Sequence, residues 1–147
     1  MIERGYGDLV TSDVDAIVNT VNTAGVMGTG LAAQVRITYP EVFTAYARAC
    51  KQGEVVVGRM HVVERVARPR YVINFPTKQH WRNPSKIEYI DSGLVDLVAQ
   101  IRELGIRSIA VPPLGCGKGR LQWSDVKPRI VAALSPLRDV RVVLYGA

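Results

Sequence analysis

The sequence has few of the residues that cross-link small proteins or hold metal ions in them. Only two cysteines, Cys50 and Cys116, and two histidines occur among its 147 residues. Two thiols are too few for a disulfide framework, and two thiols alone make a poor zinc site. We therefore expect a protein without disulfides, metal ions or other cofactors.

Signals for membranes and export are also lacking. No run of about 18 apolar residues is present, so no membrane span is expected. The first residues lack the basic and then apolar pattern of a signal peptide, which predicts a cytoplasmic location. We find no repeat, linker or low-complexity tract, and 48% of the residues are hydrophobic. The chain, residues 1–147, is therefore expected to be one domain.

The charge is unbalanced toward the basic side. The net charge is +6, and 14 arginines stand against 5 lysines. A basic surface favours polyanions, and guanidinium groups suit phosphate. A general codon bias toward arginine would give the same composition, so the charge alone identifies no nucleic-acid site.

The most informative segment covers residues 19–33. It follows a short buried strand, carries three glycines within six residues and leads into a helix. A strand, a glycine loop and a helix start in this order place backbone N–H groups along a phosphate. Asn22 stands at the end of the strand, where its amide can reach a sugar hydroxyl. The alternative is an ordinary glycine-rich turn, although such turns are usually shorter.

Hydrophobic periodicity, with glycine and proline as breaks, predicts alternating strands and helices. The predicted strands are residues 2–6, 16–21, 71–75, 108–111 and 140–144, with one or two more within 55–63. The predicted helices are residues 30–39, 41–51, 89–104 and 123–134. This order predicts an α/β fold, a three-layer α/β/α sandwich around a mainly parallel mixed sheet. Ligands of such sheets bind beyond the carboxyl ends of the strands.

A second glycine-rich loop, residues 112–120, follows another predicted strand. It is not a Walker A loop, because Pro112 and Gly119 replace the first glycine and the final Ser or Thr. Residues 28–33 spell Gly-x-Gly-x-x-Ala, but they begin too far beyond their strand for a Rossmann fingerprint. Two separate glycine loops can instead clasp one diphosphate.

Together these motifs resemble those of macrodomains, which bind ADP-ribose. The resemblance covers nearly the whole chain and rests on Gly7-Asp8-Leu9, residues 15–22, residues 28–33 and Pro113-Leu114-Gly115-Cys116-Gly117. It implies that Asp8 and Leu9 hold the adenine, residues 28–34 and 115–119 the diphosphate, and Asn22 the distal ribose. From the residues alone, Asp8 can equally form a turn or helix cap. Tyr145 could stack on the adenine or be a plain edge aromatic.

Residues 74–82 resemble the DNA ADP-ribosyl glycohydrolase antitoxins, the DarG group, which are related to terminal ADP-ribose glycohydrolases. In that group a lysine just after this strand is catalytic, which implies Lys78 here, with Asn22 beside it. The first loop reads Asn-Thr-Val-Asn instead of the common Asn-Ala-Ala-Asn, so a water-activating aspartate of other macrodomains is not carried over. A neutral lysine can attack the anomeric carbon or trap the opened sugar as a Schiff base. A charged one can stabilise the leaving group.

His80, Trp81 and Arg82 form the candidate DNA contact. An aromatic beside cations suits single-stranded nucleic acid, through base stacking and phosphate pairing. Alternatively, Trp81 packs under its loop as part of the core. His80, Arg82 and Lys118 are also candidate cationic neighbours that could lower the pKa of Lys78.

The expected function is removal of ADP-ribose from thymine in single-stranded DNA, as antitoxin to a DNA ADP-ribosyltransferase toxin of the DarT type. The alternatives are a non-catalytic ADP-ribose-binding module and a hydrolase of ADP-ribose on protein carboxylates. We expect a monomeric domain without membrane contact; relatives in this group carry a further C-terminal region, so it can be part of a longer protein. The predicted ADP-ribose site comprises Asp8, Leu9, Thr20, Val21, Asn22, Gly28, Thr29, Gly30, Leu31, Ala32, Ala33, Gln34, Thr77, Leu114, Gly115, Cys116, Gly117, Lys118 and Gly119.

Overall fold

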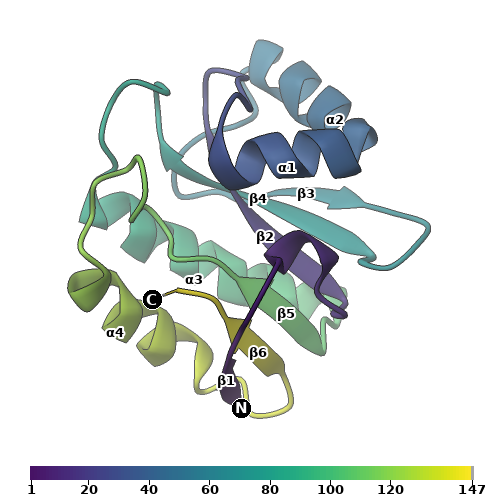
Figure 1. Cartoon of the computed structure of the whole chain (residues 1–147), viewed down its shortest axis with the longest axis vertical. Helices are drawn as coiled ribbons and strands as arrows, with labels where there is room; N and C mark the ends of the chain where they lie inside the picture. The colour runs from purple at the N-terminus through teal and green to yellow at the C-terminus, as the bar shows by residue number, and fades with distance from the viewer. Residues whose placement is uncertain (147) are drawn as a thin grey trace.

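The structure, a computed structural model, describes residues 1–146 as six strands, four helices and one short 3₁₀ helix (Figure 1). The strands are β1 (Ile2–Arg4), β2 (Ala16–Asn22), β3 (His61–Glu64), β4 (Tyr71–Lys78), β5 (Ser108–Val111) and β6 (Arg141–Leu144). The helices are η1 (Leu9–Thr11), α1 (Gly30–Thr38), α2 (Pro40–Lys51), α3 (Ile87–Leu104) and α4 (Trp123–Leu134). In the part of the chain described, no helix is both long and apolar enough to cross a bilayer.

The strands form one sheet in the order β1-β6-β5-β2-β4-β3. All neighbouring pairs are parallel except β3 with β4, which is antiparallel. In Figure 1, α1 and α2 cover one face of the sheet, and α3 and α4 cover the other. The predicted three-layer sandwich around a mainly parallel mixed sheet is therefore confirmed.

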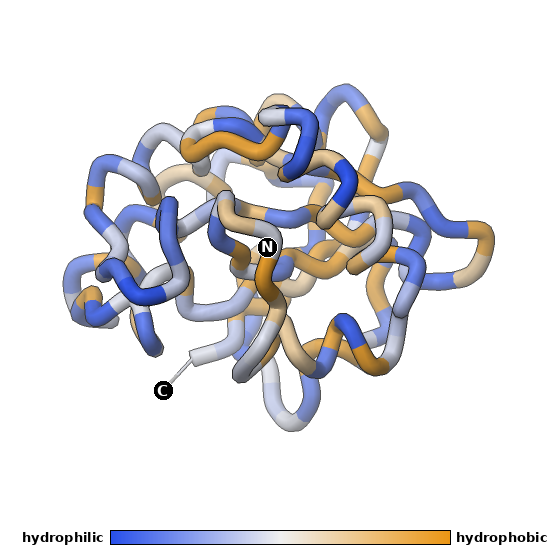
Figure 2. The backbone as a smooth tube through the Cα atoms, turned by 90° about the horizontal axis from the view of Figure 1, so that it is seen from above, coloured by the Kyte–Doolittle hydropathy of each residue, from blue (hydrophilic) through white to orange (hydrophobic). Residues whose placement is uncertain are grey.

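Each face of the sheet has its own hydrophobic core, because successive side chains of a strand point to opposite faces. Ala16 and Val18 of β2 pack with α3 and α4, whereas Ile17 and Val21 pack with α1 and α2. Figure 2 shows hydrophobic stretches interspersed with hydrophilic ones along the whole backbone. The near-continuous apolar run of β2 is typical of a strand buried on both faces.

The sequence prediction for the end of β4 was wrong, whereas one of the one or two strands expected within residues 55–63 is present. Strand β4 does not stop before Pro76 but continues to Lys78. Strand β3 pairs with β4 only as far as Asn74. Pro76, which has no backbone N–H, therefore lies where β4 has no partner on its β3 side. Within residues 55–63, only His61 onward forms a strand, because Gly58 turns the chain with φ 86° and the Met60 N–H donates to Asp96.

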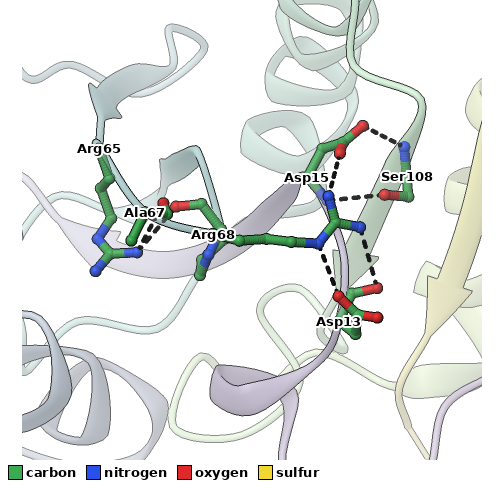
Figure 3. Close-up of polar contacts among 7 residues, drawn as sticks. Asp13, Asp15, Arg65, Ala67, Arg68 and Ser108 are labelled. Carbon is green, nitrogen blue, oxygen red and sulfur yellow. Dashed lines mark hydrogen bonds and ion pairs between the residues drawn. The ribbon is translucent and has the colours of Figure 1, made fainter.

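Polar side chains join the strands at their amino ends, opposite the end where ligands bind (Figure 3). The Asp15 carboxylate accepts hydrogen bonds from the backbone N–H groups of Arg107 and Ser108 at 2.9 and 3.2 Å. Arg68, from the β3–β4 connection, donates to Asp13 and Asp15, both at 2.7 Å. Partial burial acts to raise the pKa of Asp15, but these hydrogen bonds and the Arg68 charge hold it below its usual value.

Replacing Asp15 with alanine should therefore destabilise the fold. The two N–H groups at the start of β5 would lose their acceptor, and we expect a loss of about 1–3 kcal/mol of unfolding free energy. Asp13→Ala is the matched control, since its side chain is 92% exposed and pairs only with Arg68; about 0.5 kcal/mol is expected there. Urea denaturation measures both, and equal losses would contradict this account.

Candidate functional site

A deep cleft lies at the carboxyl ends of β2, β4 and β5, where a ligand site is expected in a parallel sheet. Its volume is about 650 Å³, within the range of small-molecule sites. Residues of the loop between β2 and α1 and of the loop after β5 line it; Figure 1 shows where these two loops lie in the fold. The lining residues are Thr20, Val21, Asn22, Val26, Gly28, Thr29, Gly30, Leu31, Ala32, Thr77, Lys78, Trp81, Arg82, Pro112, Pro113, Gly115, Gly117, Lys118, Gly119 and Arg120.

A second, more open hollow adjoins this cleft and shares Leu31, Pro112 and Pro113 with it. Its other lining residues are Gly7, Asp8, Leu9, Gln34 and Tyr145. Asp8 caps the 3₁₀ helix η1, because its Oδ1 accepts from the Val10 N–H at 3.0 Å. The cap uses one carboxylate oxygen, so the other remains for a ligand in the hollow. The two cavities together form one elongated site.

Asn22 organises the first glycine loop. Its Oδ1 accepts from the Ala24 N–H at 2.9 Å, and its Nδ2 donates to the Val26 carbonyl at 2.9 Å. The loop is also tied to the end of β4, because the Thr23 N–H and hydroxyl both donate to the Gln79 carbonyl. Helix α1 then begins at Gly30, so its unpaired N–H groups face the cleft.

The second loop is folded back tightly on itself. Gly115 has φ 73°, and the Gly119 backbone passes so close that a Cβ there would lie 2.4 Å from the Gly115 carbonyl oxygen. Arg120 adopts φ 65°, which side-chain-bearing residues rarely do. The Ser85 N–H donates to the Gly119 carbonyl at 2.9 Å. These contacts turn the loop so that Gly117, Lys118 and Gly119 line the cleft.

Lys78 reaches the cleft through a shift in strand register. Val21 pairs with Pro76, but Asn22 pairs with Lys78, so Thr77 is an extra residue in β4. Such a shift re-aims a side chain because strand residues alternate between faces. Lys78 and Asn22 consequently sit on neighbouring strands and both line the same cleft.

The Lys78 amine lies in a positive environment. Burial lowers its pKa, and the charges of Lys118 and Arg120 lower it further. Lys118 therefore lowers the pKa of Lys78, as predicted from the sequence. The second cation that lowers this pKa is Arg120, and not His80 or Arg82. The Nζ donates to the Trp81 carbonyl at 2.9 Å, which fixes its position at the rim. Lowered pKa values in clefts are typical of nucleophilic or proton-transferring lysines.

Three side chains stack at the rim of the cleft beside Lys78. The rings of His80 and Trp81 lie 5.1 Å apart at an interplanar angle of 28°, and the Arg82 guanidinium carbon lies 4.5 Å from the Trp81 centroid. Trp81 is 43% exposed, so it does not pack under its loop. Trp81 and Arg82 line the cleft, but His80 does not.

Four predicted site residues do not line either cavity: Ala33, His80, Leu114 and Cys116. Leu114 is fully buried in the core beside α3 and α4, and Cys116 packs against the same core. Ala33 points away because successive helix residues are rotated by about 100°, which places it opposite Leu31. The predicted site lacked Gly7, Val26, Pro112, Pro113 and Arg120, although the last three belong to the loop recognised as residues 112–120.

The sequence and the fold are both similar to those of known proteins. The family described as Macro domain matches residues 18–130. The DNA ADP-ribosyl glycohydrolase of Mycobacterium tuberculosis (strain ATCC 25618 / H37Rv) is 56% identical over 147 residues, which are 99% of this chain and 42% of that protein. The chain therefore spans less than half the length of this curated relative.

Solved structures agree with this match. The macrodomain of Mycobacterium tuberculosis DarG superposes with a TM-score of 0.97 at 56% identity, covering 100% of this chain and 98% of that one. Thermosipho africanus DarTG in complex with ADP-ribose superposes with a TM-score of 0.88 at 36% identity, covering 95% of this chain and 40% of that one. The likeness thus extends over the sheet, the helices and both cleft loops.

Proposed function

This chain belongs to the macrodomain family, and from that premise we propose that it is a DNA ADP-ribosyl glycohydrolase. It binds ADP-ribose in the elongated site and removes it from thymine in single-stranded DNA. In this role it is the antitoxin to a DNA ADP-ribosyltransferase of the DarT type. The observation that carries the proposal is that Lys78 pairs with Asn22 across neighbouring strands and that both residues line the same cleft.

The shape and charge of the site suit ADP-ribose. The hollow around Asp8, Leu9 and Tyr145 accepts the adenine, and the two glycine loops hold the diphosphate through free N–H groups. The distal ribose then lies near Asn22 and Lys78. Four cations line the main cleft, Lys78, Arg82, Lys118 and Arg120, and among residues 1–146 no acidic residue does. A diphosphate neutralises about two of these charges, and DNA phosphates can engage the others.

The chemistry follows from an amine whose pKa is lowered. In the covalent route, the neutral Lys78 amine forms a bond to the anomeric carbon as the bond to thymine breaks. The bonding electrons leave with the thymine ring nitrogen, and water later releases ADP-ribose and restores the amine. In the electrostatic route, the charged amine stabilises the departing thymine anion instead. The lowered pKa favours the covalent route.

The single-stranded DNA would continue from the cleft over Trp81 and Arg82. Loss of one stacking aromatic typically costs about 1–3 kcal/mol of nucleic-acid binding. We therefore expect Trp81→Ala to raise KM for an ADP-ribosylated oligonucleotide by about 5- to 150-fold. ADP-ribosylated thymidine, which has no neighbouring base, is the control substrate, and its KM should stay within about twofold. Equal changes for both substrates would exclude a stacking role.

The decisive experiment incubates the protein with an oligonucleotide ADP-ribosylated on thymine and measures product masses. The proposal requires free ADP-ribose and an unmodified oligonucleotide. An intact modified oligonucleotide, with ADP-ribose still binding, would identify a binding module without turnover. A parallel incubation with ADP-ribosylated protein tests the third possibility, and release from carboxylates alone would replace DNA as the substrate.

A further inference from the structure

The side-chain amide of Asn22 is held in one orientation. Its Oδ1 accepts from the backbone N–H of Ala24 at 2.9 Å and, more weakly, from that of Val26 at 3.4 Å. Backbone N–H groups only donate, so the oxygen must face them and the nitrogen must face away. The Nδ2 donates one hydrogen to the Val26 carbonyl at 2.9 Å. An amide nitrogen carries two hydrogens, so one remains for the cleft that Asn22 lines.

Tyr46 of α2 forms a hydrogen bond to this amide. The Tyr46 hydroxyl lies 2.8 Å from Asn22 Oδ1 and 2.7 Å from the Asn22 carbonyl oxygen, and these two acceptors share its single hydrogen. Tyr46 is fully buried, and Asn22 is only 5% exposed, so water does not compete for these contacts. Burial also raises the pKa of Tyr46 well above its usual value, so the hydroxyl keeps its proton and donates.

Tyr46 belongs to a different structural element from the other hydrogen-bond partners of the Asn22 amide. Ala24 and Val26 belong to the same loop and would move with Asn22. Within residues 1–146, Tyr46 is the side chain from outside that loop that bonds to the Asn22 amide. The next turn of α2 also packs against the loop. Gly25 lies so close to Cys50 that a Cβ built on Gly25 would be 3.5 Å from the Cys50 Cβ. Helix α2 therefore fixes where the amide stands relative to the sheet.

We infer that Tyr46 is a positioning residue, which holds Asn22 so that its free Nδ2–H donates to an oxygen of the distal ribose. The inference rests on the proposed function only in placing the distal ribose of ADP-ribose beside Asn22. It assigns Tyr46 the task of distinguishing ADP-ribose from ADP, which has the same adenine, first ribose and diphosphate but lacks the second sugar.

The test compares Tyr46→Phe with the wild-type protein by calorimetric titration of ADP-ribose and of ADP. Loss of one buried hydrogen bond predicts that the Kd for ADP-ribose rises about five- to tenfold, while the Kd for ADP stays within about twofold. Tyr39→Phe is the matched control, since its hydroxyl donates to the Val10 carbonyl at 2.8 Å and not to Asn22. It should leave the ratio of the two affinities unchanged.

A purely structural role of Tyr46 would loosen the whole loop. Because the same loop grips the diphosphate, both ligands would then bind more weakly by the same factor, and this result would overturn the inference. An unchanged affinity for ADP-ribose, or equal affinities of the wild-type protein for both ligands, would also overturn it. Wild-type protein that binds ADP-ribose but releases none from DNA would refute the proposed function and leave this inference standing.

One measurement needs no variant. In NMR spectra of the wild-type protein, the side-chain amide protons of Asn22 should shift when ADP-ribose is added and stay in place when ADP is added. This result would support the inference even if Tyr46→Phe failed to fold. An Asn22 amide that does not respond to saturating ADP-ribose would overturn it.

Discussion

Lys78→Ala is expected to lower the release of ADP-ribose from modified DNA by about 10²- to 10⁴-fold in kcat. The affinity for free ADP-ribose should change by no more than a few-fold, because the glycine loops and the hollow around Asp8 provide most of the binding contacts. Single-turnover kinetics and calorimetry measure the two quantities separately. Turnover at the wild-type rate in Lys78→Ala would remove Lys78 from the mechanism.

Two further measurements separate the covalent from the electrostatic route. A neutral amine becomes more abundant as pH rises, so the covalent route predicts a rate that increases up to the lowered pKa of Lys78 and then levels off. The electrostatic route predicts the opposite slope, because the charged form is lost. Lys78→Arg keeps a positive charge at every working pH, so residual activity in it would favour the electrostatic route.

Lys118→Ala is the matched control for these experiments. Lys118 is another cation of the same cleft, on the second glycine loop, and it lowers the pKa of Lys78. Its removal should weaken ADP-ribose binding and move the rising limb of the covalent pH profile to higher pH. A profile that stays in place would show that the titrating group is not Lys78.

Gly119→Ala should have the largest effect on binding. A Cβ at this position would lie 2.4 Å from the Gly115 carbonyl oxygen and 2.9 Å from the Gly115 Cα. Both are backbone atoms, so the loop must open, and overpacking of this kind typically costs about 1–3 kcal/mol of stability. We expect the Kd for ADP-ribose to rise at least about tenfold, since N–H groups of this loop would leave the diphosphate.

The comparison for Gly119→Ala is Gly117→Ala in the same loop. Within residues 1–146, no atom other than those of Gly117 and its two chain neighbours lies within 4 Å of a Cβ built on Gly117, so the loop can keep its shape. Calorimetry should show a change of no more than about threefold in affinity, and thermal unfolding should show a smaller loss than for Gly119→Ala. Equal effects of the two substitutions would mean that the tight approach to Gly115 does not shape the site.

The order of strands and helices could be predicted because it depends on local patterns. The apolar run before Asn22 and the breaks at Pro40 and Gly105 lie in the sequence itself, and α2 and α3 begin and end within two residues of the predicted limits. The two glycine loops could also be recognised, since residues 25–30 and 115–119 each contain three glycines.

Features that depend on contacts between distant segments could not be predicted. The extra residue Thr77 in β4 is visible only when β4 is paired with β2, although it places Lys78 opposite Asn22. The sequence predicts Leu114 in a ligand-binding loop, but its side chain is buried in the hydrophobic core beside α3 and α4. The left-handed backbone conformation of Arg120 is uncommon for residues with a side chain, so the neighbouring sequence does not predict it.

The Asp15–Arg68 ion pair and the ligand cleft lie at opposite ends of the same strands. The polar contacts of Asp15 join the start of β5 to the β3–β4 connection, while the groups proposed to act on ADP-ribose lie at Asn22, at Lys78 and in the loop after Val111. Replacements around Asp15 are therefore expected to change heat tolerance and to leave substrate preference unchanged in an engineered version.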